Sequence, residues 1–302
     1  MRTIRLTLAY DGANYSGWQV QPDRTSVQQV VEQALWELSG ERVKVAASGR
    51  TDAGVHALAQ VASFNTSLNV PVDAYRWGLV TKLPSDVVVT NAEEVPYGYH
   101  ARFDAVRKTY RYVIHASRTA IPWLRNYVWW HRGDLDDGAM QQALEVFLGE
   151  HDFRCFETQW PNRSSSVRTI YEARWTRTST WMPWCTEGPL LSGQTLGANG
   201  ESAISPDRVE GAPFLCLEIT ANGFLYNMVR AIVGTLVPVG RGRWTVDDIR
   251  RILDTGDRSH AGDTAPAQGL YLANVVTVVD LDRIADRLAR LEQLREDRAD
   301  DD

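Results

Sequence analysis

The chain has 302 residues, which is long for one compact domain and typical of two domains or of one duplicated fold. Apolar residues make up 44% and charged residues 23% of the sequence. This ordinary globular composition excludes a disordered, collagenous or coiled-coil chain. No apolar run approaches the roughly 20 residues that span a bilayer, and the first residues lack the apolar core of a signal peptide. We therefore expect a cytoplasmic protein.

The net charge of -6 hides an uneven distribution of charge along the chain. Residues 281–302 carry eight acids and five arginines, whereas residues 100–132 carry seven basic residues and one acid, Asp104. Of the 32 basic residues 29 are arginine, a side chain suited to phosphate and base recognition. A GC-rich genome would give the same enrichment. The composition thus permits a local basic surface without showing one.

Hydrophobic periodicity predicts alternating strands and helices along the first hundred residues. Residues 3–10 alternate like a strand with one buried face. Ser26 is a typical N-cap for a helix whose apolar residues recur at 3.6-residue spacing until Gly40. We expect short strands at 43–45 and 60–64, and a short helix over 72–82.

The pattern begins again after about residue 104. We expect strands over 108–114, 167–177 and 214–221. We expect helices from Asp136 or Asp137 to Leu148, and from about Phe224 to Val237. Strand–helix–strand units in both halves predict a duplicated α+β fold with antiparallel sheets, divided into an N-terminal subdomain, 1–104, and a C-terminal subdomain, 105–280.

Two segments differ from this pattern. Residues 181–213 are rich in Gly, Pro and Ser without any period, so we expect a flexible surface insertion between two strands. Residues 281–302 predict an amphipathic helix followed by an acidic tail, and core docking is a better interpretation of the helix than partner binding. Its apolar residues are Leu281, Ile284, Leu288, Leu291 and Leu294.

The densest group of residues that could carry chemistry is Gly49-Arg50-Thr51-Asp52-Ala53-Gly54-Val55-His56-Ala57. It places an acid, Asp52, two residues from a base, Arg50, between two glycines in a connection between strands. Glycine lets the backbone approach a ligand closely, and catalytic groups concentrate on such loops. A surface Asp–Arg pair in an ordinary turn is the structural alternative.

This segment resembles the active-site motif of the TruA family of tRNA pseudouridine synthases, and other segments resemble further family motifs in the same order. They are Tyr10-Asp11-Gly12 with Gly17-Trp18-Gln19, His100–Ala105 with Lys108–Tyr112, Asn222–Arg230, and Ala265-Pro266 with Gly269–Leu272. The resemblance covers about residues 3–278, interrupted by 181–213. Val80-Thr81 departs from the Leu-Asn type of pair that relatives usually carry.

The resemblance implies a pseudouridine synthase fold, in which two similar α+β subdomains join their sheets around a central cleft. It implies isomerisation of uridine to pseudouridine at positions 38, 39 and 40 of the tRNA anticodon stem-loop. It also implies base flipping, a homodimer with tRNA as partner, and no cofactor. We expect no DNA or membrane partner.

Carried over by position, the resemblance makes Asp52 the catalytic aspartate, as a nucleophile or as a base that yields a glycal. Arg230 would pair with Asp52, and an adjacent cation lowers an aspartate pKa. The Tyr110 ring would stack on the flipped uracil, although a core tyrosine fits its strand equally well. Arg50 would enter the space that the flipped nucleotide leaves.

A phosphate-tracking surface would come from the basic residues of 102–132, which are Arg102, Arg107, Lys108, Arg111, Arg118, Arg125 and Arg132. His56 is more typical of a structural histidine than of a catalytic one. The Cys, His and carboxylate residues lack the spacing of metal ligands, and the three cysteines do not form a disulfide framework.

Two other classes of function remain open at this point. A tRNA-binding or tRNA-folding protein with incidental catalysis would keep its function after Asp52→Ala. A carboxylate-based hydrolase of nucleosides or glycosides would need a second positioned carboxylate, which could reach Asp52 only through folding.

Overall fold

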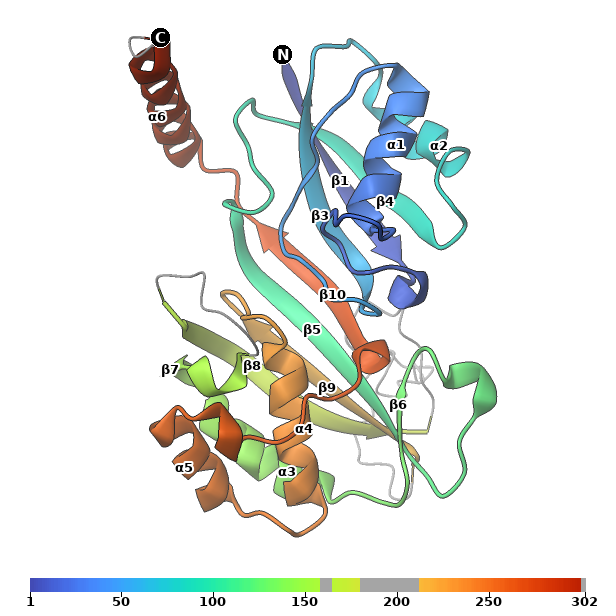
Figure 1. The fold of residues 1–302 in the computed structure, drawn as a ribbon, viewed down its shortest axis with the longest axis vertical. Coiled ribbons are helices and arrows are strands. Elements are labelled where there is room, and N and C mark those ends of the chain that lie inside the picture. The colour runs from blue at the N-terminus through green and yellow to red at the C-terminus, as the bar shows by residue number, and fades with distance from the viewer. Residues whose placement is uncertain (158–164, 180–211, 300–302) are drawn as a thin grey trace, which may run out of the picture. The chain divides into compact units, whose positions relative to one another are not determined.

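The computed structural model describes residues 1–157, 165–179 and 212–299 of the chain (Figure 1). Its strands are β1 (Arg2–Tyr10), β2 (Ala46–Ala47), β3 (His56–Thr66), β4 (Val87–Val95), β5 (Ala105–Ala116), β6 (Trp129–His131), β7 (Gly149–Asp152), β8 (Val167–Thr178), β9 (Phe214–Ala221) and β10 (Leu270–Thr277). Its α-helices are α1 (Val27–Ser39), α2 (Val72–Val80), α3 (Asp137–Leu144), α4 (Met228–Gly240), α5 (Val246–Thr255) and α6 (Leu281–Ala299). Within the described ranges, no helix is both long enough and apolar enough to cross a membrane.

The strands belong to a large mixed sheet, which corrects the expectation of antiparallel sheets. Most pairings are antiparallel, but β10 runs parallel to β3 and β6 runs parallel to β5. A parallel pair needs a long crossover connection, and most of the chain lies between β3 and β10. Periodicity reveals which face of a strand is buried, but not the direction of its neighbour.

The first of two compact units comprises residues 1–51, 59–106 and the segment from Val275 onward. Strand β1 pairs antiparallel with β4, with Leu6 opposite Ala92. Its alternate residues Ile4, Leu6 and Leu8 are fully buried, as the alternation predicted. In the same unit α1 packs against α2, and α2 packs against β4 (Figure 1).

Helix α1 confirms the predicted helix and both of its ends. The Ser26 hydroxyl accepts a hydrogen bond from the Gln29 N–H, and this satisfies one of the free amides of the first turn. Gly40 ends the helix at φ 73°, a left-handed conformation that glycine adopts without strain. The expected strand at 43–45 is wrong: the short strand β2 lies just beyond it and pairs with β3.

The second unit comprises residues 52–58 and 107–274. Its strands follow the order β10-β5-β9-β8-β7, and β6 lies beside β5. Helix α3 packs against α4, α5 and β8 (Figure 1). Asp136 caps α3 by accepting from the Ala139 N–H. The predicted subdomain boundary near 104 and the predicted duplication remain interpretations.

Helix α4 begins at Met228, four residues later than the periodicity indicated. The preceding residue, Asn227, has a φ of 60°, which belongs to a left-handed conformation and cannot continue a right-handed helix. The apolar pattern of 224–237 therefore predicted the helix correctly but placed its start too early. The insertion expected at 181–213 falls between β8 and β9 in the sequence. Except for its last two residues, it lies outside the part of the chain that the structure describes.

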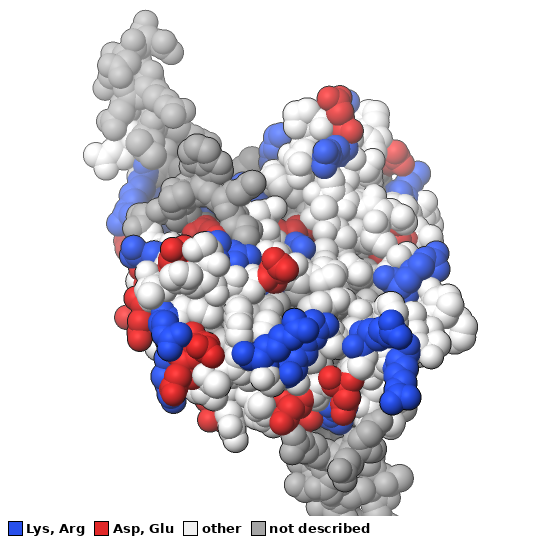
Figure 2. Space-filling model, turned by 60° about the horizontal axis from the view of Figure 1, so that its bottom comes forward, with Lys and Arg blue, Asp and Glu red and all other residues white. Residues whose placement is uncertain are grey.

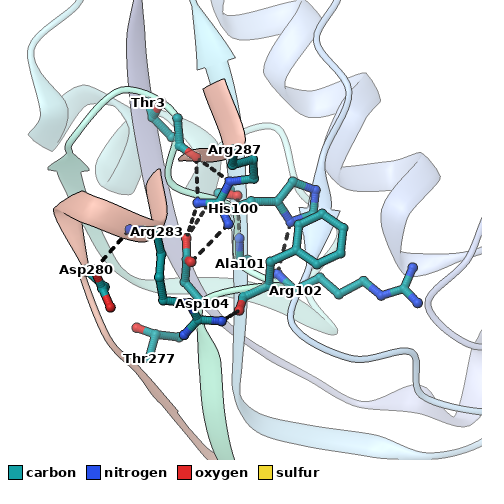
Figure 3. Close-up of polar contacts among 12 residues, drawn as sticks. Thr3, His100, Ala101, Arg102, Asp104, Thr277, Asp280, Arg283 and Arg287 are labelled. Atoms are coloured by element: carbon teal, nitrogen blue, oxygen red, sulfur yellow. Dashed lines mark hydrogen bonds and ion pairs between the residues drawn. The ribbon is translucent and has the colours of Figure 1, made fainter. Parts of the chain in front are cut away.

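Helix α6 belongs to the first unit and packs within it through fewer apolar residues than expected. Ile284 is buried, but Leu281 is 64% and Leu291 is 51% exposed. The stronger anchor is polar: Arg287 donates to both carboxylate oxygens of Asp104, at 3.1 and 2.8 Å. Figure 3 shows Arg283 and Arg287 of α6 directed toward the loop that carries Asp104.

Candidate active site

Asp52 lies at the start of a tight turn in the loop between β2 and β3. The Val55 N–H donates to the Asp52 carbonyl at 3.1 Å, and this contact closes the turn. Gly54 occupies the turn at φ 78°, where a side chain would be strained. A Cβ at Gly54 would also touch Ala267 at 3.4 Å. The glycine of the motif therefore has a backbone role next to the candidate carboxylate.

The residues just before Asp52 are held by side chains from the other sequence motifs. The Gln60 amide donates to the Gly49 carbonyl at 2.8 Å. The hydroxyls of Tyr10 and Thr51 lie 2.8 Å apart, and the Trp18 N–H donates to the Thr51 carbonyl at 3.0 Å. Because these contacts fix Gly49 and Thr51, the backbone that leads into Asp52 has little freedom.

Arg230 approaches Asp52 from the first turn of α4. Its Nη1 lies 3.7 Å from Asp52 Oδ2, and the two side chains are only 17% and 16% exposed. The guanidinium also donates from Nε to the Ala265 carbonyl at 2.7 Å and from Nη1 to Asn227 Oδ1 at 2.6 Å. The structure thus brings together two of the residues that the sequence selected.

The pKa of Asp52 is raised, whereas we expected the neighbouring Arg230 to lower it. Burial raises this pKa above the ordinary value of an aspartate, and the Arg230 charge and hydrogen bond offset only part of that rise. Removal from water disfavours the charged carboxylate more than the Arg230 cation favours it. The sequence could indicate that Arg230 pairs with Asp52. The net direction of the pKa shift depends on how deeply Asp52 is buried and on its 3.7 Å separation from Arg230, which the sequence does not show.

Tyr110 and Tyr112 lie on the same face of β5 and have different surroundings. The Tyr110 ring is 7% exposed and meets Phe224 edge-to-face at 5.1 Å. Tyr112 is fully buried, and its hydroxyl donates to the Pro266 carbonyl at 2.7 Å. Burial raises the pKa of Tyr112 well above its usual value, while the Arg230 charge acts in the opposite direction.

The loop from Gly262 to Pro266 connects these side chains, and sequence reasoning gave it no role. Ala265 receives the Arg230 Nε hydrogen bond and donates its own N–H to the Arg230 carbonyl at 3.1 Å. Pro266 receives the Tyr112 hydroxyl. The motif Ala265-Pro266 includes both residues whose carbonyls accept these bonds. Because every residue has a backbone carbonyl, the residue types did not indicate that role.

Arg50 is exposed, two residues before Asp52. Within the part of the chain that the structure describes, its guanidinium has no hydrogen-bond or ion-pair partner. Arg102 is also exposed, with its guanidinium 5.8 Å from the Phe103 ring. Arg107 lies over the exposed Tyr171 ring at 4.7 Å, and Lys108 is partly buried on β5.

The basic surface expected from residues 102–132 is smaller than their number suggested. Arg111 is buried and donates from Nε to Glu218 at 2.7 Å, so its charge is compensated inside the protein. It lies on the strand face opposite to Tyr110 and Tyr112, where β9 supplies the acid. Among the described residues visible in Figure 2, Lys and Arg lie among Asp and Glu and do not form one continuous basic patch.

His56, the residue before the last of the motif, is buried in the second unit. It is 2% exposed, stacks on Tyr271 at 4.7 Å, and contacts the Asn126 carbonyl through Nε2 at 2.9 Å. These contacts assign it a packing role. In the same described residues no group of three or more His, Cys, Asp or Glu side chains could hold a metal ion.

The two described cysteines are poor nucleophiles. Burial raises the pKa of the Cys155 thiol to about 11 and that of Cys216 to about 12, so both stay protonated near neutral pH. Neither cysteine is therefore a candidate nucleophile of the second unit.

Comparison with known proteins agrees with this arrangement. A family model described as tRNA pseudouridine synthase matches residues 7–104 and 143–276. The chain is 38% identical to tRNA pseudouridine synthase A of Thermoanaerobacter sp. (strain X514), over 91% of this chain and 100% of the relative. It is 41% identical to the enzyme of that name from Ruminiclostridium cellulolyticum and 40% identical to that from Geobacter sp. (strain M21), over 91% of this chain and 99% and 98% of those relatives.

The fold and the match to the family model define a pseudouridine synthase domain with mixed α and β structure. The chain belongs to the tRNA pseudouridine synthase family, whose members are isomerases that act on uridine in tRNA.

Proposed function

We propose that this chain converts uridine to pseudouridine at positions 38, 39 and 40 of the tRNA anticodon stem-loop, with Asp52 as the catalytic carboxylate. The observation that carries the proposal is the buried ion pair between Asp52 and Arg230 in the motif loop. A carboxylate kept from water beside one fixed cation is typical of an active site, where charge is used for chemistry. The relatives' names supply the substrate class.

The reaction breaks the bond between C1′ of the ribose and N1 of uracil, turns the base, and joins C1′ to C5. As a nucleophile, the ionised Asp52 would attack C1′ as N1 leaves, and its bond to C1′ would break when C5 attacks that carbon. As a base, it would remove a ribose proton as N1 leaves, which gives a glycal, and would return that proton to the ribose when C5 adds to C1′. Both routes need the carboxylate charged, and the Arg230 guanidinium favours that form. The proton on C5 leaves once the new carbon–carbon bond has formed.

The target uridine has to leave the helical stack before Asp52 can reach its ribose. Extrusion of a base costs a few kcal/mol. We assign Arg50 to the space that the nucleotide leaves, because its guanidinium is exposed and has no partner among the described residues. The Tyr110 ring, which packs perpendicular to the Phe224 ring, would stack on the flipped uracil.

Binding of the tRNA backbone would involve Arg102, Arg107 and Lys108. Arg102 and Arg107 are exposed, and structured RNA is recognised mainly through shape and phosphates. We further propose that two copies of the chain act as a homodimer in the cytoplasm, so that one tRNA draws basic residues from both copies. Neither the proposed chemistry nor the motifs require a cofactor.

The positional assignment can be tested with tRNA transcripts that retain uridine at 38, 39 or 40 alone. Pseudouridine would be located by carbodiimide-dependent stops of reverse transcription. We expect a new stop at the retained uridine in each transcript and no stop in a transcript that lacks all three. Modification confined to another part of the tRNA would contradict the anticodon assignment.

A further inference from the structure

Asn227 holds an unusual position immediately before α4. Its φ of 60° and ψ of 5° are left-handed, and among the described residues only Asp23 shares a positive φ without being glycine. An asparagine before a helix ordinarily accepts a hydrogen bond from an amide of the first turn. Asn227 makes no such cap. Its Oδ1 instead accepts from Arg230 Nη1 at 2.6 Å.

This contact is one of two that orient the Arg230 guanidinium. Nε donates to the Ala265 carbonyl at 2.7 Å, so the group is held from both ends. Both acceptors are neutral, and neither compensates the positive charge. Within the described chain, Asp52 is the one carboxylate at ion-pair distance from Arg230, at 3.7 Å.

We propose that Asn227 is a positioning residue whose neutral oxygen orients the Arg230 guanidinium toward Asp52 without taking its charge from that carboxylate. The left-handed backbone brings the side chain to Arg230, three residues later, instead of to the helix amides. The inference rests on the proposed catalytic role of Asp52, and it concerns how that carboxylate is kept charged.

The charged and titratable groups around this contact come from three elements. Asp52 lies in the loop before β3, Arg230 on α4, and the Tyr112 hydroxyl on β5 bonds to the Pro266 carbonyl. The stretch that contains Ala265 contacts Arg230 through the Ala265 backbone, and its one carboxylate, Asp263, is exposed. A change of charge at position 227 therefore acts mainly through Arg230 on Asp52.

Asparagine is the residue that meets both requirements. Aspartate has the same shape and accepts the same bond, but its charge would pair with Arg230 and repel Asp52. Both effects disfavour ionised Asp52. Glycine adopts the left-handed backbone even more readily, but it has no oxygen to offer the guanidinium.

The test compares Asn227→Asp and Asn227→Gly with Asp23→Gly, a control that relieves the other left-handed non-glycine position among the described residues. Turnover would be followed as release of tritium from uracil C5 of tRNA across pH. The pKa of Asp52 would be measured by carbon NMR of aspartate-labelled protein, and the Asp52→Asn spectrum would assign its signal. A thermal midpoint would be recorded for each variant.

For Asn227→Asp we expect the Asp52 pKa and the midpoint of the acidic limb of turnover to rise together by about one unit. For Asn227→Gly we expect turnover to fall about tenfold, with KM changed less than about twofold and the thermal midpoint unchanged or higher, since misplaced groups cost rate more than stability. The Asp23→Gly control should keep the turnover of the natural chain and the same midpoint of the acidic limb of its pH profile.

The readouts separate failure of this inference from failure of the proposed function. If Asn227→Asp raises the Asp52 pKa while Asp52→Asn still converts tRNA, the positioning role of Asn227 is supported and the catalytic role of Asp52 is contradicted. If Asp52→Asn is inactive but Asn227→Asp moves neither the pKa nor the limb, the inference is overturned. A parallel loss of thermal midpoint and turnover in Asn227→Gly would also overturn it, because a purely structural role at the helix start explains that result.

Discussion

Substitution of Gly234 by alanine should damage both the stability of the second unit and the placement of Arg230. Gly234 lies inside α4, where a Cβ would stand 1.7 Å from the carbonyl oxygen of Asp263. The loop residue Gly262 also lies against the helix, because a Cβ on Gly262 would stand 2.4 Å from the Gly234 carbonyl oxygen. Two stretches of backbone touch at this point, so no side chain can move aside.

The magnitude follows from that contact. Atoms at 1.7 Å must separate by more than an ångström, which requires α4 and the loop to move apart. Overpacking of this kind costs about 1–3 kcal/mol, and in a chain of this size 3 kcal/mol corresponds to a thermal midpoint lower by about 5 °C. The same movement would lengthen the Ala265–Arg230 hydrogen bonds, so turnover should fall as well.

Gly78→Ala is the matched control, since Gly78 is also helical and its Cβ would lie 2.6 Å from an atom of Leu38. That atom ends a flexible side chain, which can rotate away. Thermal unfolding followed by circular dichroism, together with tritium release, would compare the two variants. If Gly234→Ala unfolds at the same temperature as Gly78→Ala and keeps full turnover, the close approach of α4 and the loop is not what holds Arg230.

Three further outcomes follow from the same contacts. Arg230→Met should shift the acidic limb of turnover to higher pH, because burial already raises the Asp52 pKa and the substitution removes the charge that opposes the rise; a pH profile with an unmoved limb would exclude this pairing. Arg287→Met should cost about 3 kcal/mol in urea unfolding, since it leaves the fully buried Asp104 without its cation. Arg283→Met, which removes one exposed hydrogen bond from the same helix, should cost far less, and equal losses would show that Asp104 is not the anchor. Affinity for tRNA, measured by filter binding, should fall steeply as salt increases because phosphate contacts release counterions; a flat salt dependence would argue against backbone recognition.

The sequence predicted elements well where one local pattern determined them. The alternation in β1 and the capped stripe of α1 each depend on residues close together in the chain, and both are confirmed. The start of α4 was missed because the apolar pattern runs through Asn227, and a pattern of apolar residues does not reveal the left-handed backbone of that residue. Helix α5 was not predicted, although Thr245 and Asp248 form a complete capping box at its start.

The candidate site was partly predictable for the same reason. The motifs identified Asp52 and Arg230, which lie far apart in the chain and meet at 3.7 Å. The direction of the Asp52 pKa depends on burial, which no local pattern encodes. Arg111 was misjudged because its acid partner Glu218 comes from a strand distant in sequence.

The central claim is that Asp52 is the carboxylate that carries the isomerisation. The most direct measurement uses a tRNA transcript with tritium at uracil C5, because the new C1′–C5 bond expels that label into water. The natural chain and Asp52→Asn would be compared at equal tRNA occupancy. We expect release by the natural chain and none by Asp52→Asn, with tRNA binding intact in both. Release by Asp52→Asn at the natural rate, or none from either protein while both bind tRNA, would contradict the account.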